Sequence, residues 1–278
     1  MSGVALVTDS ASDLPLKLAE ERQIDVVPLT IRFGDHELVD RVELSPTEFW
    51  ARCASSAVLP ETAAPAPGVF RAAFDQAAER DHEGVVCITL SSALSATYQS
   101  AAAAAAESPL PVRVVDSRSI TMGQGLITLA GAELAARGAP LDEVAGAVER
   151  LVGQTRVYGA LATLENLRKG GRIGPAAAVF GSMLSIKPII ELRGGVVEGE
   201  SRQRTRRKSL EYLAEKVRRH GELQRLAVVH GNAPDLDDFL RLLGPIVGER
   251  PFLVCELGPV IGTHAGPGAI GVTFQVAD

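Results

Sequence analysis

The sequence contains few aromatic residues and no excess of positive charge. Aromatic side chains make up 4% of its 278 residues, with a single tryptophan, and the formal net charge is −6. Proteins that bind nucleic acid depend on positive charge, and those that bind single strands also stack the bases on aromatic rings. We therefore expect no nucleic-acid partner.

Long apolar runs and paired cysteines are also missing. No segment reaches the roughly 20 apolar residues that a membrane-spanning helix needs, and the opening MSGVALVTDS has no secretory signal. The cysteines Cys53, Cys87 and Cys255 are far apart and lie in apolar surroundings. This pattern is typical of buried thiols in a reducing compartment, so we expect a cytoplasmic protein.

The motifs of several enzyme classes are absent. The chain has neither the P-loop of ATP-binding proteins nor the Gly-x-Ser-x-Gly turn of serine hydrolases. Asp9 and Asp13 have a spacing that would suit a metal, but no third ligand is near them in the sequence. We expect them to form turns and caps, and we expect neither a metal nor a cofactor.

Short apolar runs alternate with stretches rich in alanine and leucine. Several runs are continuously apolar, which favours strands covered on both faces, as in parallel α/β sheets. The sequence therefore predicts an α/β protein of two α/β domains, residues 1–155 and 156–278, the first with a largely parallel sheet. The expected strands are 4–8, 24–29, 84–90, 112–116, 158–163, 186–192, 225–230, 252–258 and 270–276.

Hydroxyl side chains follow an apolar run at Ser91 and Ser92. The carboxyl ends of parallel strands form a ligand crevice, and the next helix begins there with free N–H groups. A serine at such a place either caps the helix or donates a hydrogen bond to an anion. Thr62, in the proline-rich loop 60–68, is an ordinary loop threonine or a further hydroxyl at that crevice.

Two basic segments and one histidine complete the candidates. Arg172 follows Gly170 and Gly171, where it belongs either to a solvated helix end or to an anion site. Segment 202–208 is a solvated face or a docking patch for a protein, a phosphate group or an anionic lipid surface. His264 lies in a glycine-rich loop, 258–271, where it would donate to a carboxylate or transfer a proton.

Taken together, these segments resemble the DegV family of bacterial fatty-acid-binding proteins. The resemblance runs in order from residue 7 to residue 271, essentially the whole chain. It rests on VTDSASDLP, ETAAPAPGVF, LSSALSATYQSA, VVDSRS, LENLRKGGRIG, KPII, QRTRRK and GTHAGPGAIG.

The resemblance implies a fold and a function. It implies two α/β domains, with a long-chain fatty acid buried between or within them. The protein would be a lipid carrier without catalysis of its own. A separate ATP-binding kinase subunit would phosphorylate the carboxylate, and the acyl-phosphate would feed phospholipid synthesis. Contact with a membrane surface would be transient.

The resemblance also implies roles for individual residues. Thr62 and Ser92, together with Ser91 and His264, would bind the carboxylate. The residues that would face the phosphorylation site or the kinase are Arg172, Arg202 and Arg204. Candidates for lining the acyl tail, or for simple core packing, are Phe180, Met183 and Leu184. The chain departs from the family at Ala63 and Ala64, where polar residues are common, and this changes the expected head-group contacts.

Two other functions are compatible with the residues alone. The first is an esterase or acyltransferase in which Ser92 is the nucleophile and His264 its base. The second is a docking protein whose functional surface is the basic segment 202–208.

Overall fold

The computed structural model describes residues 3–56, 58–180 and 186–277. Its first half is built on a four-stranded sheet, in the order β2-β1-β6-β7, in which every pairing is parallel. The strands are β1 (Val4–Asp9), β2 (Ile24–Val27), β6 (Gly84–Thr89) and β7 (Val112–Asp116). Both β1 and β6 are buried along their whole length, as their continuous apolar runs predict.

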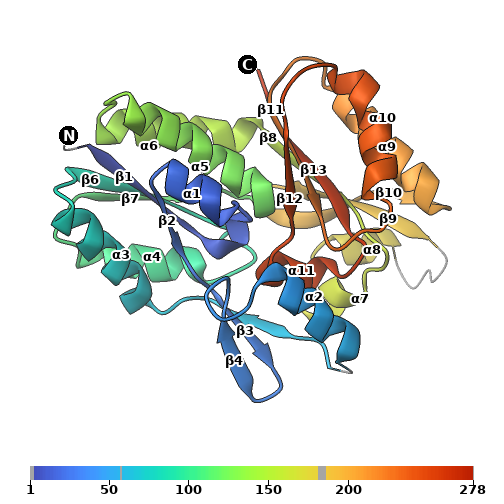
Figure 1. Cartoon of the computed structure of the whole chain (residues 1–278), viewed down its shortest axis with the longest axis horizontal. Helices are drawn as coiled ribbons and strands as arrows, with labels where there is room; N and C mark the ends of the chain where they lie inside the picture. The colour runs from blue at the N-terminus through green and yellow to red at the C-terminus, as the bar shows by residue number, and fades with distance from the viewer. Residues whose placement is uncertain (1–2, 57, 181–185, 278) are drawn as a thin grey trace.

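Helices cover both faces of this parallel sheet (Figure 1). One face packs against α3 (Pro67–Glu79) and α4 (Thr97–Ala106). The other face packs against α1 (Leu16–Glu21), α5 (Thr121–Ala136) and α6 (Leu141–Gln154). The sheet is therefore the middle layer of a three-layer α/β arrangement.

The second half is built on a six-stranded sheet, in the order β10-β9-β8-β13-β11-β12. Its strands are β8 (Thr155–Ala160), β9 (Lys187–Arg193), β10 (Val196–Gln203), β11 (Leu223–His230), β12 (Leu253–Glu256) and β13 (Ile270–Val276). Within the described strands the pairing of β11 with β12 is parallel and the others are antiparallel. One face is covered by α9 (Arg206–Arg219), against which α10 (Leu236–Val247) packs.

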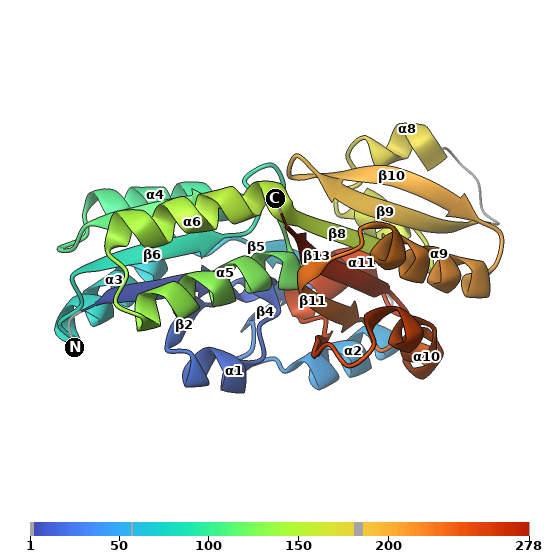
Figure 2. The ribbon, with the colours of Figure 1, turned by 90° about the horizontal axis from the view of Figure 1, so that it is seen from above.

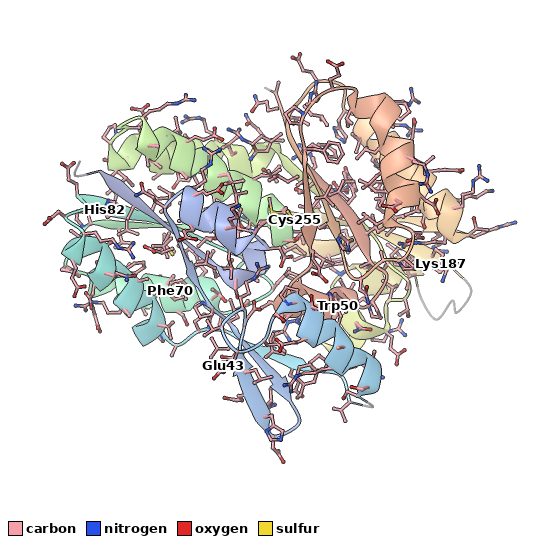
Figure 3. The ribbon with its side chains drawn as sticks, in the orientation of Figure 1. Glu43, Trp50, Phe70, His82, Lys187 and Cys255 are labelled. Carbon is pink, nitrogen blue, oxygen red and sulfur yellow. The ribbon has the colours of Figure 1, made fainter. Side chains whose placement is uncertain are left out.

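A small antiparallel sheet and several short helices fill the junction between the halves. The sheet has the order β4-β3-β5, with β3 (Thr30–Phe33), β4 (His36–Val39) and β5 (Glu61–Ala63). The helices are η1 (Ser10–Ser12), α2 (Pro46–Ser55), α7 (Glu165–Lys169), α8 (Ala176–Phe180) and α11 (Pro259–Ala265). Trp50, labelled in Figure 3, lies on α2, and its ring approaches Gly262 of α11 closely.

Helix α5 connects the two large sheets. It packs against β1 and β6 of the first sheet and against β8, β11 and β13 of the second (Figure 2). Residues 121–132 of this helix are all buried. The division into domains 1–155 and 156–278 stays a prediction, and the core beneath α5 contains side chains from both ranges.

Some strands were not predicted, and some local predictions were wrong. Strands β3, β4 and β5 have only three or four residues each, and β10 is largely polar, so none has the apolar run by which a strand is recognised. Helix α4 begins at Thr97, not directly after Ser92, and the glycine-rich loop contains the short helix α11. Of the three free cysteines, Cys87 and Cys255 are buried, whereas Cys53 is half-buried.

Candidate functional site

A cavity lies where the two halves meet, beyond the carboxyl ends of the parallel strands. The cavity has a volume of about 190 Å³. It is lined by Leu29, Thr62, Ala63, Ala64, Leu90, Leu94, Ser95, Ala96, Ile120, Leu161, Leu167, Arg172, Ile190, Val197, Val260, Ile261, His264 and Ala265.

Most of these lining side chains are aliphatic, so the cavity suits a predominantly apolar ligand. The polar side chains among the described lining residues are Thr62, Ser95, Arg172 and His264. Such a cavity provides hydrophobic burial over most of its wall and hydrogen bonding at a few points. This combination suits an amphipathic molecule with one polar group.

Thr62 and His264 form the centre of the polar part. Thr62 is placed by β5, where it pairs with Ile31 of β3, and His264 is placed by the last turn of α11. The Thr62 Oγ1 and His264 Nε2 atoms are 3.0 Å apart. The structure therefore brings together two predicted site residues that are 202 positions apart in the sequence.

His264 is neutral near pH 7. Burial lowers its pKa from 6.5 to about 4, and the nearby positive charge of Arg172 acts in the same direction. A neutral imidazole carries one N–H, so it can donate one hydrogen bond and accept another. Its Nδ1 atom is buried and has no hydrogen-bond partner among the described residues.

Gly170 leaves room for the His264 ring. A Cβ on Gly170 would lie 2.5 Å from His264 Nδ1 and 2.9 Å from His264 Cε1. Gly170→Ala is therefore expected to push the ring out of the wall, toward water, and to raise the pH at which its NMR signals titrate toward 6.5. Gly153→Ala is the control, because a Cβ there meets nothing within 4 Å. An unchanged His264 titration in Gly170→Ala would contradict this packing.

Arg172 is fixed in the same wall by backbone carbonyl groups. Its Nε donates to the Leu94 carbonyl (3.2 Å) and its Nη1 to the Gly170 carbonyl (2.7 Å). Together with Thr62 and His264, it also lines an outer cleft that includes Glu61, Lys169 and Asn166. These three residues therefore form a wall shared by an apolar cavity and a more polar cleft.

The structure places Ser91 and Ser92 differently from the expectation. Ser91 Oγ donates to the Gly195 carbonyl (2.7 Å), and Ser92 Oγ donates to Asp116 Oδ2 (2.5 Å). Neither serine lines the described part of the cavity, whereas Ser95 does. Because a turn at residues 91–96 precedes α4, the third serine of LSSALS reaches the wall instead of the first two. The binding of a carboxylate by Ser91 and Ser92 stays a prediction.

The other candidates are dispersed. Arg202 and Arg204 are exposed, at the end of β10 and just after it, and the Arg202 guanidinium donates to the Val179 carbonyl. Phe180 is buried and packs near Gly199 of β10, outside the described cavity lining. Met183 and Leu184 lie outside the described residues. The lining of an acyl tail by Phe180, Met183 and Leu184 stays a prediction. The contact of Arg202 and Arg204 with a partner also stays a prediction.

Ala63 and Ala64, the two departures from the family pattern, both line the cavity next to Thr62. Among residues 3–56, 58–180 and 186–277, no three His, Cys, Asp or Glu side chains are grouped so as to hold a metal ion. Within the same ranges, no helix combines the length and the apolar character needed to cross a membrane.

Comparison with known proteins gives consistent matches along the chain. A family model described as an uncharacterised protein of the DegV family matches residues 3–277. A DegV domain-containing protein of Streptomyces coelicolor is 40% identical over 276 residues, 98% of each chain. A DegV domain-containing protein of Listeria monocytogenes is 34% identical over 280 residues, again 98% of each chain.

Solved structures agree with this assignment. A Thermus thermophilus DegV family protein, described for its fatty acid binding, has a TM-score of 0.89 and 34% identity, covering 99% of this chain and 100% of that one. DegV of Bacillus subtilis, described as a fatty acid binding protein, has a TM-score of 0.88 and 29% identity, with 100% coverage of both chains. This chain is a member of the DegV family.

Proposed function

We propose that this protein binds a long-chain fatty acid, with the tail in the cavity and the carboxylate at Thr62 and His264. The observation that carries the proposal is an aliphatic cavity whose described polar groups include this hydrogen-bonded pair. Burial of each methylene group contributes about 0.8 kcal/mol, and the carboxylate must be hydrogen-bonded for that gain to be kept. The aliphatic lining supports the first requirement, and the Thr62–His264 pair supports the second.

The polar wall is suited to a single carboxylate. Thr62, Ser95 and neutral His264 provide hydrogen-bond donors, one of which is used within the Thr62–His264 pair, and Arg172 provides one positive charge. Backbone carbonyls hold the Arg172 guanidinium, so it would stabilise the carboxylate without needing to form a direct ion pair. Ser92 would join the site only by releasing Asp116.

We further propose that the protein is the lipid-carrying component of a fatty acid kinase. Thr62, Arg172 and His264 line both the cavity and the outer cleft, so a carboxylate at this wall would be accessible from the cleft. A separate ATP-dependent subunit would approach there and transfer a phosphoryl group to the carboxylate. The acyl-phosphate would then supply phospholipid synthesis, and Arg202 and Arg204 are candidates for contacting the kinase.

The alternative of a serine hydrolase has little geometric support. A nucleophilic serine needs a base within hydrogen-bond reach. Ser92 Oγ donates to Asp116, and His264 Nε2 is paired with Thr62. The docking alternative is also weakened, because Arg206 pairs with Asp235 (2.7 Å) and Arg207 with Glu211 (2.9 Å).

Mass spectrometry of an organic-solvent extract of the purified protein tests fatty acid binding. We expect about one long-chain fatty acid per protein, and roughly 10- to 100-fold weaker binding in Thr62→Val, which loses a hydrogen bond to a charged group. Thr47→Val is the matched control, because Thr47 is exposed on α2. A wild-type protein that is empty and takes up no added fatty acid would contradict the proposal.

The carrier role has its own test. The purified protein is incubated with ATP, magnesium and fatty acid, and acyl-phosphate is trapped with hydroxylamine. We expect no product until a kinase subunit is added. Product formed by the protein alone would show that it is itself the kinase.

A further inference from the structure

A buried ion pair lies beside the start of α11, away from the cavity wall. Asp13 follows η1 and Arg41 follows β4, and Arg41 Nη2 lies 3.0 Å from Asp13 Oδ1. The Asp13 side chain is 0% exposed and the Arg41 side chain is 8% exposed. Arg41 Nη1 also donates to the Leu14 carbonyl (2.8 Å), which ties the pair to the segment after β1.

This pair contacts the backbone of α11 directly. The N–H of Gly258, the residue before the helix, donates to Asp13 Oδ1 at 2.8 Å, across 245 positions of sequence. A Cβ on Gly258 would lie 2.8 Å from Arg41 Nη2 and 2.9 Å from Asp13 Oδ1. The close approach therefore needs glycine at this position.

The surroundings hold the pair in a strained geometry. Asp13, Arg41 and Thr121 have φ values of 53°, 62° and 48°, in the left-handed region that few side chains adopt. Burial raises the pKa of Asp13, although Arg41 and the Gly258 N–H oppose that shift. Two further buried carboxyl groups, Asp9 and Asp40, lie close enough for the charge of Asp13 to contribute to raising the pKa of each.

Such an arrangement favours accurate placement over stability. Replacing a buried ion pair by apolar residues is often neutral or stabilising, because desolvation offsets the attraction between the charges. Backbone strain of this kind persists only where the surrounding structure determines it, and it is common at functional sites. The pair nevertheless joins the N-terminal half to one helix of the C-terminal half.

Helix α11 carries this contact to the polar wall. It has only seven residues, and Val260, Ile261 and His264 line the cavity from it. His264 is six positions after Gly258, less than two helical turns, so a shift at Gly258 moves the imidazole. Trp50 lies against Gly262 on the flank of the helix, and Asn166 Nδ2 donates to the Thr263 carbonyl (3.0 Å) near its end.

We infer that Asp13 and Arg41 are positioning residues for the ligand site, because they hold the start of α11 so that His264 lies beside Thr62. Neither residue lines the described cavity, so they act through the helix. The effect on ligand affinity rests on the proposed function, whereas the effect on the His264 ring does not.

The test is Gly258→Ala, which removes no polar group but pushes the ion pair away from the helix. The control is Gly244→Ala in α10, where a Cβ meets nothing within 4 Å. Two properties are measured on folded protein: the NMR titration of the His264 ring nitrogens without ligand, assigned with His264→Asn, and the Kd for oleate. Glu61, Lys169 and Arg172, the charged groups of the adjoining cleft, are the same in all variants.

We expect Gly258→Ala to raise the titration midpoint of His264 by one pH unit or more and to weaken oleate binding at least tenfold. The control should match the wild type in both. If Gly258→Ala does not fold, Asp13→Asn is tested by the same two measurements, since asparagine tolerates the left-handed turn. We expect Asp13→Asn to weaken oleate binding about threefold and to shift the titration midpoint of His264 by less than Gly258→Ala would. A folded variant with the wild-type titration overturns the inference. If the wild type binds no oleate, the proposed function fails, and the titration of His264 still tests whether Asp13 and Arg41 position α11.

Discussion

Arg41→Met is expected to lower the free energy of unfolding at pH 7 by about 3–5 kcal/mol, because it leaves buried Asp13 without its counter-ion. The loss should shrink in acid, since burial raises the pKa of Asp13 and raises that of Asp40 to about 6. Protonation removes the uncompensated charges. Urea unfolding followed by circular dichroism at pH 5 and pH 7 measures both effects.

Arg32→Met is the matched control for this experiment. Arg32 pairs with Glu61 on the surface, where the two side chains are 50% and 67% exposed. Exposed ion pairs contribute little, so the change should be small at either pH. If Arg41→Met were as mild as the control, Asp13 would not depend on Arg41 as its counter-ion.

The contribution of Asp9 to the free energy of unfolding is expected to fall by about 4 kcal/mol as the pH rises from 4 to 8. Burial raises the pKa of Asp9 from 3.8 to about 7. Between these values the folded protein keeps a proton that the unfolded chain releases, so increasing pH favours unfolding. Asp9→Asn cannot titrate. The difference in unfolding free energy, variant minus wild type, should therefore rise by about 4 kcal/mol over this range.

Comparing Asp9→Asn with the wild type separates the contribution of Asp9 from that of groups whose contribution to stability changes in the opposite direction with pH. The pKa of His264 is lowered to about 4, so its contribution makes folding more favourable as the pH rises from 4 to 6.5, in both proteins alike. Asp142→Asn is the control, because that side chain is 79% exposed and its replacement should change stability little. A flat difference for Asp9→Asn would show that Asp9 is ionised throughout.

Asp9 also shows how far local sequence patterns reach. The expectation that it caps a turn is correct, because its Oδ1 accepts the Ala11 N–H at 3.0 Å. Its other oxygen accepts the N–H of Leu90 at 2.8 Å, 81 positions away. That second contact depends on the parallel pairing of β1 with β6, and no spacing within TDSASD indicates it.

The candidate site was predicted in part. Thr62, Arg172 and His264 were named from the sequence, and the structure places all three in one wall. Ser95 was not named as a site residue, because a helix was expected to begin directly after β6 and Ser95 was expected to face solvent or bond to the helix backbone. Asp13 and Arg41 were not connected with the site, since their contact with Gly258 exists only after three distant segments have packed together.

The sequence by itself determined the α/β class, the long buried strands and the family, because apolar runs and ordered motifs are properties of the chain. Only the tertiary structure decided which hydroxyls face the cavity, that His264 is neutral, and which residues hold α11. Those properties depend on distances between residues up to 245 positions apart and on exclusion of water, which arise when the two halves pack around α5.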